Sequence, residues 1–106
     1  MTLINIGIAG CLGRMGRELV KETINNNQLN FVGGFERSQH KDIHKKISNL
    51  IDINTDCIVS DDPKRIFSDS DVVIDFTTPQ STLQNILTAS ELNTPIVIGT
   101  TGLEKK

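Results

Sequence analysis

The sequence predicts an α/β protein built on a parallel sheet. Short apolar runs, several of them β-branched, alternate with segments whose apolar residues recur at helical spacing. The first run, residues 3–9, is almost continuously apolar, as is typical of a central strand covered on both faces. It leads directly into three glycines spaced three residues apart, Gly10, Gly13 and Gly16. Together these features favour a Rossmann-like, doubly wound sheet of about five strands.

A helix is predicted after the glycines, over residues 13–26. Gly16 would lie inside this helix at a cost of up to about 1 kcal/mol, which close packing on the first strand would offset. The residues expected to face the sheet are Met15, Leu19, Val20 and Ile24. The residues expected to face solvent are Arg14, Arg17, Glu18 and Lys21.

The middle of the chain carries weaker patterns. Residues 29–35 are predicted as the second strand, parallel and adjacent to the first because their connection is short. A second helix is expected over residues 41–51, and a short third strand over residues 57–59. Asp62 can cap a brief helix that starts at Pro63.

The last third repeats the alternation. Residues 71–76 are predicted as the fourth strand, and Thr78 caps a helix that starts at Pro79. Residues 96–98 form the fifth strand, and the strand order is expected to be 3-2-1-4-5. The helix residues expected to face inward are Leu83, Ile86, Leu87 and Leu92.

A strand order of this kind reverses between the first and fourth strands and opens a crevice at the carboxyl edge of the sheet. The loops 10–16, 76–79 and 99–102 should meet there. Glycines between a strand and a helix suit the pyrophosphate of a dinucleotide, although a plain turn is the alternative. Glu36, twenty residues after Gly16, lies where such folds place an acid for the adenosine ribose. Arg37 could instead bind a 2′-phosphate, so both NADH and NADPH remain open.

Catalytic machinery is not apparent in the sequence. No Ser/His/Asp or Cys/His arrangement and no metal cluster is visible, and His40 and His44 are expected to face solvent. Asp75 is more simply a structural carboxylate bonded to loop amides than a catalytic base. Cys11 and Cys57 match no metal or disulfide framework, which is consistent with the cytoplasm.

The totals place the chain in a broad class. A length of 106 residues suggests a single domain, here a dinucleotide-binding domain over residues 1–106. The net charge of −2 gives no indication of a nucleic-acid partner. No apolar run approaches the roughly 20 residues that span a bilayer, so no membrane association is expected.

The motifs resemble one family closely, the 4-hydroxy-tetrahydrodipicolinate reductases (dihydrodipicolinate reductases) of lysine and diaminopimelate biosynthesis. The resemblance covers essentially the whole chain and rests on the order and spacing of its turns. The matching stretches are Ile8-Ala9-Gly10, Gly13-Arg14-Met15-Gly16-Arg17, Glu36-Arg37, Asp75-Phe76-Thr77 with Pro79, and Val97-Ile98-Gly99-Thr100-Thr101-Gly102.

The resemblance implies a reductase that transfers hydride from NADPH or NADH to a cyclic dicarboxylate. Residues Gly10, Cys11, Leu12, Gly13, Arg14 and Met15 would hold the pyrophosphate. Glu36 and Arg37 would bind the adenosine ribose or its 2′-phosphate, Thr77 would belong to the cofactor site, and Gly99, Thr100 and Thr101 would contact the nicotinamide side. Leu12 stands where glycine is common and is expected to crowd the pyrophosphate slightly, while Thr78 and Gln80-Ser81 also depart from the family pattern.

Family members continue into a substrate domain that carries the catalytic groups, and none of its motifs occurs in these residues. The sequence is therefore expected to be the amino-terminal part of a longer enzyme, inactive alone. Its fifth strand would form an exposed sheet edge, which predicts self-association, as in homo-oligomeric family members, or another partner at that edge. A free-standing nucleotide-binding module and a domain of another nicotinamide oxidoreductase remain as alternatives.

Overall fold

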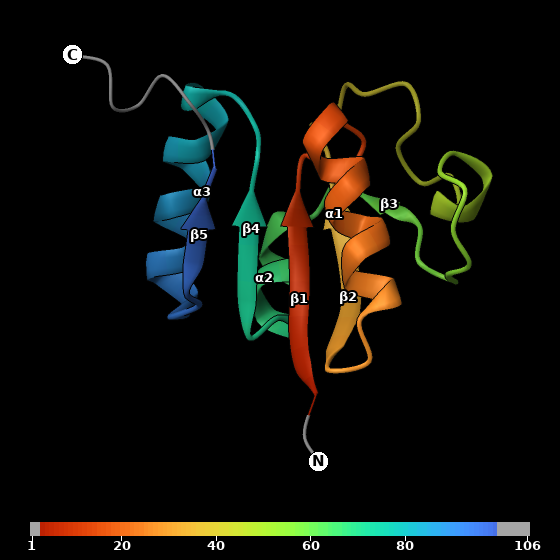
Figure 1. Cartoon of the computed structure of the whole chain (residues 1–106). Helices are drawn as coiled ribbons and strands as arrows, with labels where there is room; N and C mark the ends of the chain where they lie inside the picture. The colour runs from red at the N-terminus through yellow and green to blue at the C-terminus, as the bar shows by residue number, and fades with distance from the viewer. Residues whose placement is uncertain (1–2, 100–106) are drawn as a thin grey trace.

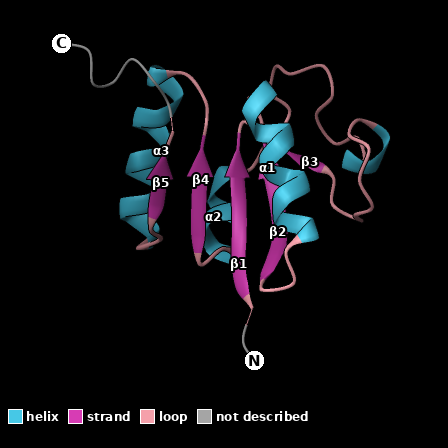
Figure 2. Cartoon of the chain, viewed as in Figure 1, coloured by secondary structure: helices cyan, strands magenta, loops and turns pink. Residues whose placement is uncertain are grey.

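A computed structural model describes residues 3–99 of the chain as a three-layer α/β domain. One parallel sheet lies between α1 on one face and α2 and α3 on the other (Figures 1 and 2). The elements in chain order are β1 (Ile4–Ala9), α1 (Arg14–Asn25), β2 (Leu29–Phe35), the 3₁₀ helix η1 (Ile47–Asn49), β3 (Val59–Ser60), α2 (Pro63–Asp69), β4 (Val72–Asp75), α3 (Pro79–Leu92) and β5 (Ile96–Ile98).

The sheet order is β3-β2-β1-β4-β5, and every pairing is parallel, which confirms the predicted fold. The central strand β1 pairs with β2 on one side and with β4 on the other, so Ile6 lies beside both Phe31 and Val72. Because all five strands run the same way, their carboxyl ends meet at one edge (Figure 1). The loops that were predicted to form a site follow these ends.

Two apolar clusters fill the space between the layers. Under α1 the buried side chains come from β1, β2, the β1–α1 turn and the segment around η1. Under α2 and α3 a second cluster forms around Phe67, which contacts Phe35 at a ring-centroid distance of 6.0 Å. Burial on both faces of β1 explains why its sequence is nearly continuously apolar.

The prediction of a helix over residues 41–51 is wrong. This segment forms turns and the single 3₁₀ turn η1. Its backbone instead pairs with the strand that follows: the His44 N–H donates to the Val59 carbonyl at 2.8 Å, and the Ile47 N–H donates to the Cys57 carbonyl at 3.0 Å. Ile47 and Ile51 are buried all the same, so the apolar spacing reports burial without a helix. The third strand is Val59–Ser60 and not the predicted 57–59.

The exposed and buried faces of two helices, α1 and α3, differ from the prediction. Met15 is 48% exposed, and Arg17, which was expected in solvent, is half-buried. On α3, Leu83 and Leu87 are 58% and 66% exposed. The side of α3 that faces the sheet carries Thr82, Asn85 and Ala89, two of them polar. These polar side chains pack where the end of β4 provides hydrogen-bond partners, as described below.

The helix ends follow local chemistry. Asp62 caps α2 by accepting from the Arg65 N–H at 3.4 Å, and Thr78 caps α3 by accepting from the Ser81 N–H at 3.3 Å. Each of these helices has proline in its first turn, as predicted. Asn93 ends α3 in the left-handed conformation, with φ of 55°. These caps fix the points at which both helices leave the carboxyl edge.

Candidate functional site at the carboxyl edge

The turn between β1 and α1 is shaped by close backbone contacts. Gly10 has a φ of 77°, and a Cβ there would lie 2.9 Å from the Thr77 methyl carbon. A Cβ on Gly16 would overlap the carbonyl oxygen of Gly10, so α1 packs directly onto the turn. Gly13 caps α1 without a side chain. The first N–H groups of a helix lack intrahelical partners, so this end of α1 can donate to an anion.

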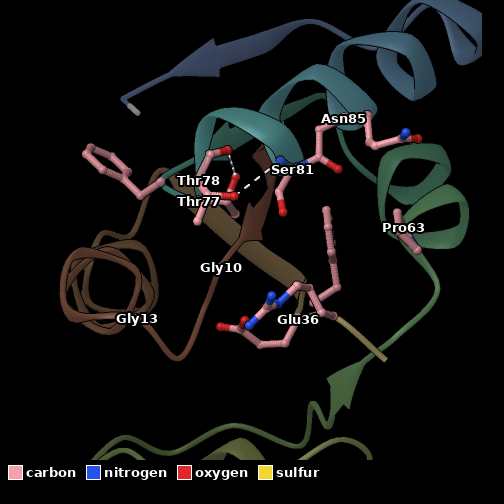
Figure 3. A pocket seen from close by; sticks show the side chains of 12 residues that line it. Gly10, Gly13, Glu36, Pro63, Thr77, Thr78, Ser81 and Asn85 are labelled. Carbon is pink, nitrogen blue, oxygen red and sulfur yellow. Dashed lines mark hydrogen bonds between the residues drawn. The ribbon is translucent and has the colours of Figure 1, made fainter. Parts of the chain in front are cut away.

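A cavity of about 470 Å³ lies beside this turn, at the carboxyl edge of the sheet (Figure 3). It is bounded by the glycine turn, the end of β2, the start of α2, and the β4–α3 loop with the first half of α3. The lining residues are Gly10, Gly13, Phe35, Glu36, Arg37, Pro63, Phe76, Thr77, Thr78, Ser81, Gln84 and Asn85. Most of the walls are apolar or neutral, and Glu36 and Arg37 carry the charged groups among these residues.

Glu36 reaches from the end of β2 to the glycine turn. Its Oε2 accepts a hydrogen bond from the Leu12 backbone N–H at 2.8 Å. The neighbouring Arg37 is exposed and also lines the cavity. An acceptor and a donor therefore lie next to each other on one wall, where a ribose or its phosphate could be bound.

A buried network anchors the opposite wall. The Asp75 carboxylate, at the end of β4, accepts from the Thr77 N–H at 2.8 Å and from the Thr77 hydroxyl at 2.6 Å through Oδ1. Its Oδ2 accepts from the Asn85 amide at 3.1 Å. Asp75 thus holds the β4–α3 loop on α3, which confirms the structural role expected for it.

Gly99 follows β5 and lies against Phe76 of the cavity wall. Its N–H donates to the Asp75 carbonyl at 2.8 Å, and a Cβ at this position would collide with the Phe76 ring. A larger residue at position 99 would therefore require the Phe76 ring to move. Thr100 and Thr101, which were predicted to belong to the same turn, lie outside the described residues.

The structure brings five of the predicted cofactor residues to the cavity, namely Gly10, Gly13, Glu36, Arg37 and Thr77. Cys11 and Leu12 do not line the cavity, and their side chains are buried in the core below α1. Leu12 is 7% exposed, which argues against the expected crowding of a pyrophosphate by its side chain. Arg14 and Met15 lie exposed on the first turn of α1.

Several lining residues were not predicted from the sequence. Pro63 reaches the cavity because β3 pairs beside β2. Ser81, Gln84 and Asn85 share one side of α3, close to where that helix leaves the sheet edge. Polar residues spaced by three or four in the first half of such a helix were the available signal.

The thiol of Cys11, which lies in the glycine turn, is fully buried. Burial, with a smaller effect from the Glu36 charge, raises the pKa of the Cys11 thiol to about 12. This thiol is therefore protonated at neutral pH and unsuited to act as a nucleophile. Between residues 3 and 99, no three His, Cys, Asp or Glu side chains are grouped to hold a metal ion. Within the same range, no helix is long and apolar enough to cross a membrane.

Comparison with known proteins identifies the domain. Residues 4–106 match the family model described as dihydrodipicolinate reductase, N-terminus. The chain belongs to this family. It is 40% identical over 107 residues to the 4-hydroxy-tetrahydrodipicolinate reductase of Pelagibacter ubique, covering 100% of this chain and 37% of that protein. It is 42% identical over 101 residues to the same reductase of Wolbachia pipientis wMel, covering 95% of this chain and 38% of that protein.

A solved member of the reductase family has the same fold. The dihydrodipicolinate reductase of Paenisporosarcina sp. TG-14, determined with dipicolinate bound, superposes with a TM-score of 0.74 at 26% identity. The match covers 95% of this chain and 38% of that one. The chain therefore spans less than two fifths of the length of these reductases, and the matching part is their amino-terminal domain.

Proposed function

We propose that this domain binds a nicotinamide dinucleotide, NADPH or NADH, for a 4-hydroxy-tetrahydrodipicolinate reductase. The observation that carries the proposal is the cavity at the carboxyl edge, which has the glycine turn at one end and Glu36 and Arg37 on its wall. Such an arrangement matches the three parts of an adenosine diphosphate: a base, a ribose and a pyrophosphate. Membership of a reductase family supports the same assignment.

Each part of the cofactor has proposed partners. The pyrophosphate lies at the turn of residues 10–15, where backbone N–H groups can donate to it. Glu36 accepts from the ribose hydroxyls, and Arg37 pairs with a 2′-phosphate when one is present. The adenine enters the cavity between Arg37, Pro63 and Ser81. The chain from Gly99 through Thr101 contacts the nicotinamide side.

The cofactor supplies the hydride, and this domain binds and orients it. We assign no catalytic residue to the described residues, since Asp75 is committed to Thr77 and Asn85. The reduction of 4-hydroxy-tetrahydrodipicolinate to tetrahydrodipicolinate, and the binding of that cyclic dicarboxylate, are proposed for the longer enzyme. Residues 1–106 alone would bind cofactor without turnover. The location is proposed to be the cytoplasm, in keeping with two free thiols.

Self-association is proposed through β5, an edge strand of the described sheet. Val97 is 55% exposed, and Ile98 beside it is also exposed. An apolar edge strand pairs readily with another strand. Sedimentation of the 106-residue chain should show concentration-dependent association, and Val97→Lys should reduce it. Association that is unaffected by Val97→Lys would exclude this edge.

A cavity-filling variant tests the proposed cofactor site. Calorimetric titration of the 106-residue chain with NADH and NADPH should show binding, while incubation with substrate should show no turnover. Ser81→Phe places a ring in the cavity and should lower the affinity for both cofactors by at least about tenfold, which corresponds to roughly 1.4 kcal/mol of binding free energy. Ser90→Phe, exposed near the other end of α3, is the matched control and should bind as the natural sequence does. Equal binding by all three chains would refute the proposed site.

A further inference from the structure

Arg17 makes contacts that its place on an amphipathic helix did not predict. From the first half of α1 its guanidinium turns back toward the glycine turn. Nε donates to the Leu12 carbonyl at 2.8 Å, and Nη1 donates to the Leu50 carbonyl at 3.0 Å. The Arg17 side chain thus joins the glycine turn to the segment that follows η1, where Leu50 lies 33 residues beyond Arg17.

The same Leu12 residue is held at three points. Arg17 binds its carbonyl, and Glu36 accepts from its N–H at 2.8 Å. Its side chain is buried in the core cluster that also contains Ile47 and Val20. Both polar contacts involve an ionisable side chain, and charge-assisted hydrogen bonds are the stronger kind. Leu12 is therefore fixed from α1, from β2 and from the core at once.

Cys11, which precedes Leu12, is buried in the same core, but the two glycines of the turn have no side chains to hold them. Gly10 and Gly13 flank the turn, and glycine leaves the backbone free to adopt many conformations. A ligand that binds such a loop must order it, which lowers affinity, whereas a loop already held in place binds more tightly. The contacts at Leu12 supply that order before the ligand arrives.

We propose that Arg17 is a positioning residue that holds the pyrophosphate-binding turn in shape through Leu12 and Leu50. The inference rests on the proposed dinucleotide function. Among the described residues, those lining the cavity do not include Arg17, so its effect passes through the Leu12 peptide. The consequence is selective: ligand parts bound by the turn depend on Arg17, and parts bound elsewhere in the cavity do not.

Two probes and three variants test this role by NMR titration of the chain. ADP-ribose contains the pyrophosphate, whereas adenosine lacks it. Arg17→Met should lower the affinity for ADP-ribose by about tenfold and the affinity for adenosine by less than about twofold. Arg17→Lys, with one ammonium in place of a planar fork, should restore part of the loss. Arg65→Met, an exposed arginine on α2, is the matched control and should leave both affinities unchanged.

Hydrogen exchange gives a readout that needs no ligand. In Arg17→Met the Leu12 amide should exchange faster than in the natural chain or in Arg65→Met. If the natural chain bound no ADP-ribose, the dinucleotide function would be refuted. Faster exchange of the Leu12 amide in Arg17→Met would in that case still support Arg17 as the positioning residue of the turn. Unchanged exchange at Leu12, or an equal loss of ADP-ribose and adenosine affinity in Arg17→Met, would overturn the proposal.

Discussion

The side-chain amide of Asn85 on α3 donates to the buried carboxylate of Asp75 at the end of β4, at 3.1 Å. Asp75 also accepts two hydrogen bonds from Thr77, which lines the cavity. A polar side of α3 is therefore packed against the sheet where an apolar one was expected. The Asp75–Asn85 hydrogen bond therefore both holds α3 on the sheet and supports the wall of the proposed site.

Replacing Asp75 by asparagine should destabilise the domain by about 1–3 kcal/mol. Thr77 and Asn85 donate to the two carboxylate oxygens, so the new amide nitrogen would face one of these donors. Urea denaturation measures the free energy of unfolding. Asp69→Asn, exposed at the end of α2, is the control. A loss below about 0.5 kcal/mol in Asp75→Asn would show that the network has little weight.

Gly16→Ala should also destabilise the domain, although alanine favours helices by up to about 1 kcal/mol over glycine. The added Cβ would overlap the Gly10 carbonyl, which is backbone and cannot rotate away. We expect a net loss of about 1–3 kcal/mol in thermal or urea unfolding. For Gly13→Ala the nearest atom to the new Cβ is the Gly10 oxygen at 3.3 Å, so a smaller loss is expected. A Gly16→Ala variant as stable as the natural chain would mean that α1 can move off the turn.

Glu36→Gln should shift cofactor preference toward NADPH. Glutamine keeps an acceptor for the Leu12 N–H but removes the negative charge that would repel a 2′-phosphate. The ratio of the NADPH to the NADH dissociation constant should fall by about tenfold in calorimetric titrations. Glu22→Gln, exposed on α1, should leave the ratio unchanged. A ratio that stays constant in Glu36→Gln would remove Glu36 from cofactor selection.

The buried Cys11 thiol should lower the free energy of unfolding as the pH rises above 9.0. Burial raises its pKa in the folded chain to about 12, from an ordinary value of 9.0. Between these values the unfolded chain loses the proton while the folded chain keeps it, so the stabilisation present below pH 9.0 declines as pH rises toward 12. The stability advantage of the natural chain over Cys11→Ala should therefore shrink in urea unfolding at about pH 10 compared with about pH 8. Cys57→Ala serves as the control, and an advantage that is independent of pH would contradict the prediction.

The sheet and its order could be predicted because their signals are local. Apolar β-branched runs, glycine after β1, and proline one residue after Asp62 or Thr78 each mark an element with a physical cause. Alternation of strands and helices then restricts the connections to parallel, right-handed ones. Glu36 was located by its distance from Gly16 along the chain, and the structure places it beside the turn.

The errors arise where tertiary contacts override a local pattern. Ile47 and Ile51 are spaced as in a helix, yet backbone pairing of His44 with Val59 and of Ile47 with Cys57 determines the conformation there. Likewise, Leu83 and Leu87 have the hydrophobicity of core residues but are exposed. The face of α3 that packs on the sheet is the one from which Asn85 donates to Asp75. A partner distant in sequence decided each case, and apolar periodicity contains no information about such partners.

The central position of β1 has a consequence for how the chain is assembled. A short connection joins β1 to its neighbour β2, but the other neighbour, β4, begins only at Val72, 66 residues beyond its partner Ile6. Closing so long a loop is entropically costly, and sheets with distant pairings fold slowly. One edge of β1 therefore remains unpaired until β4 has formed, and the half of the domain that holds the glycine turn is complete only when β4 docks.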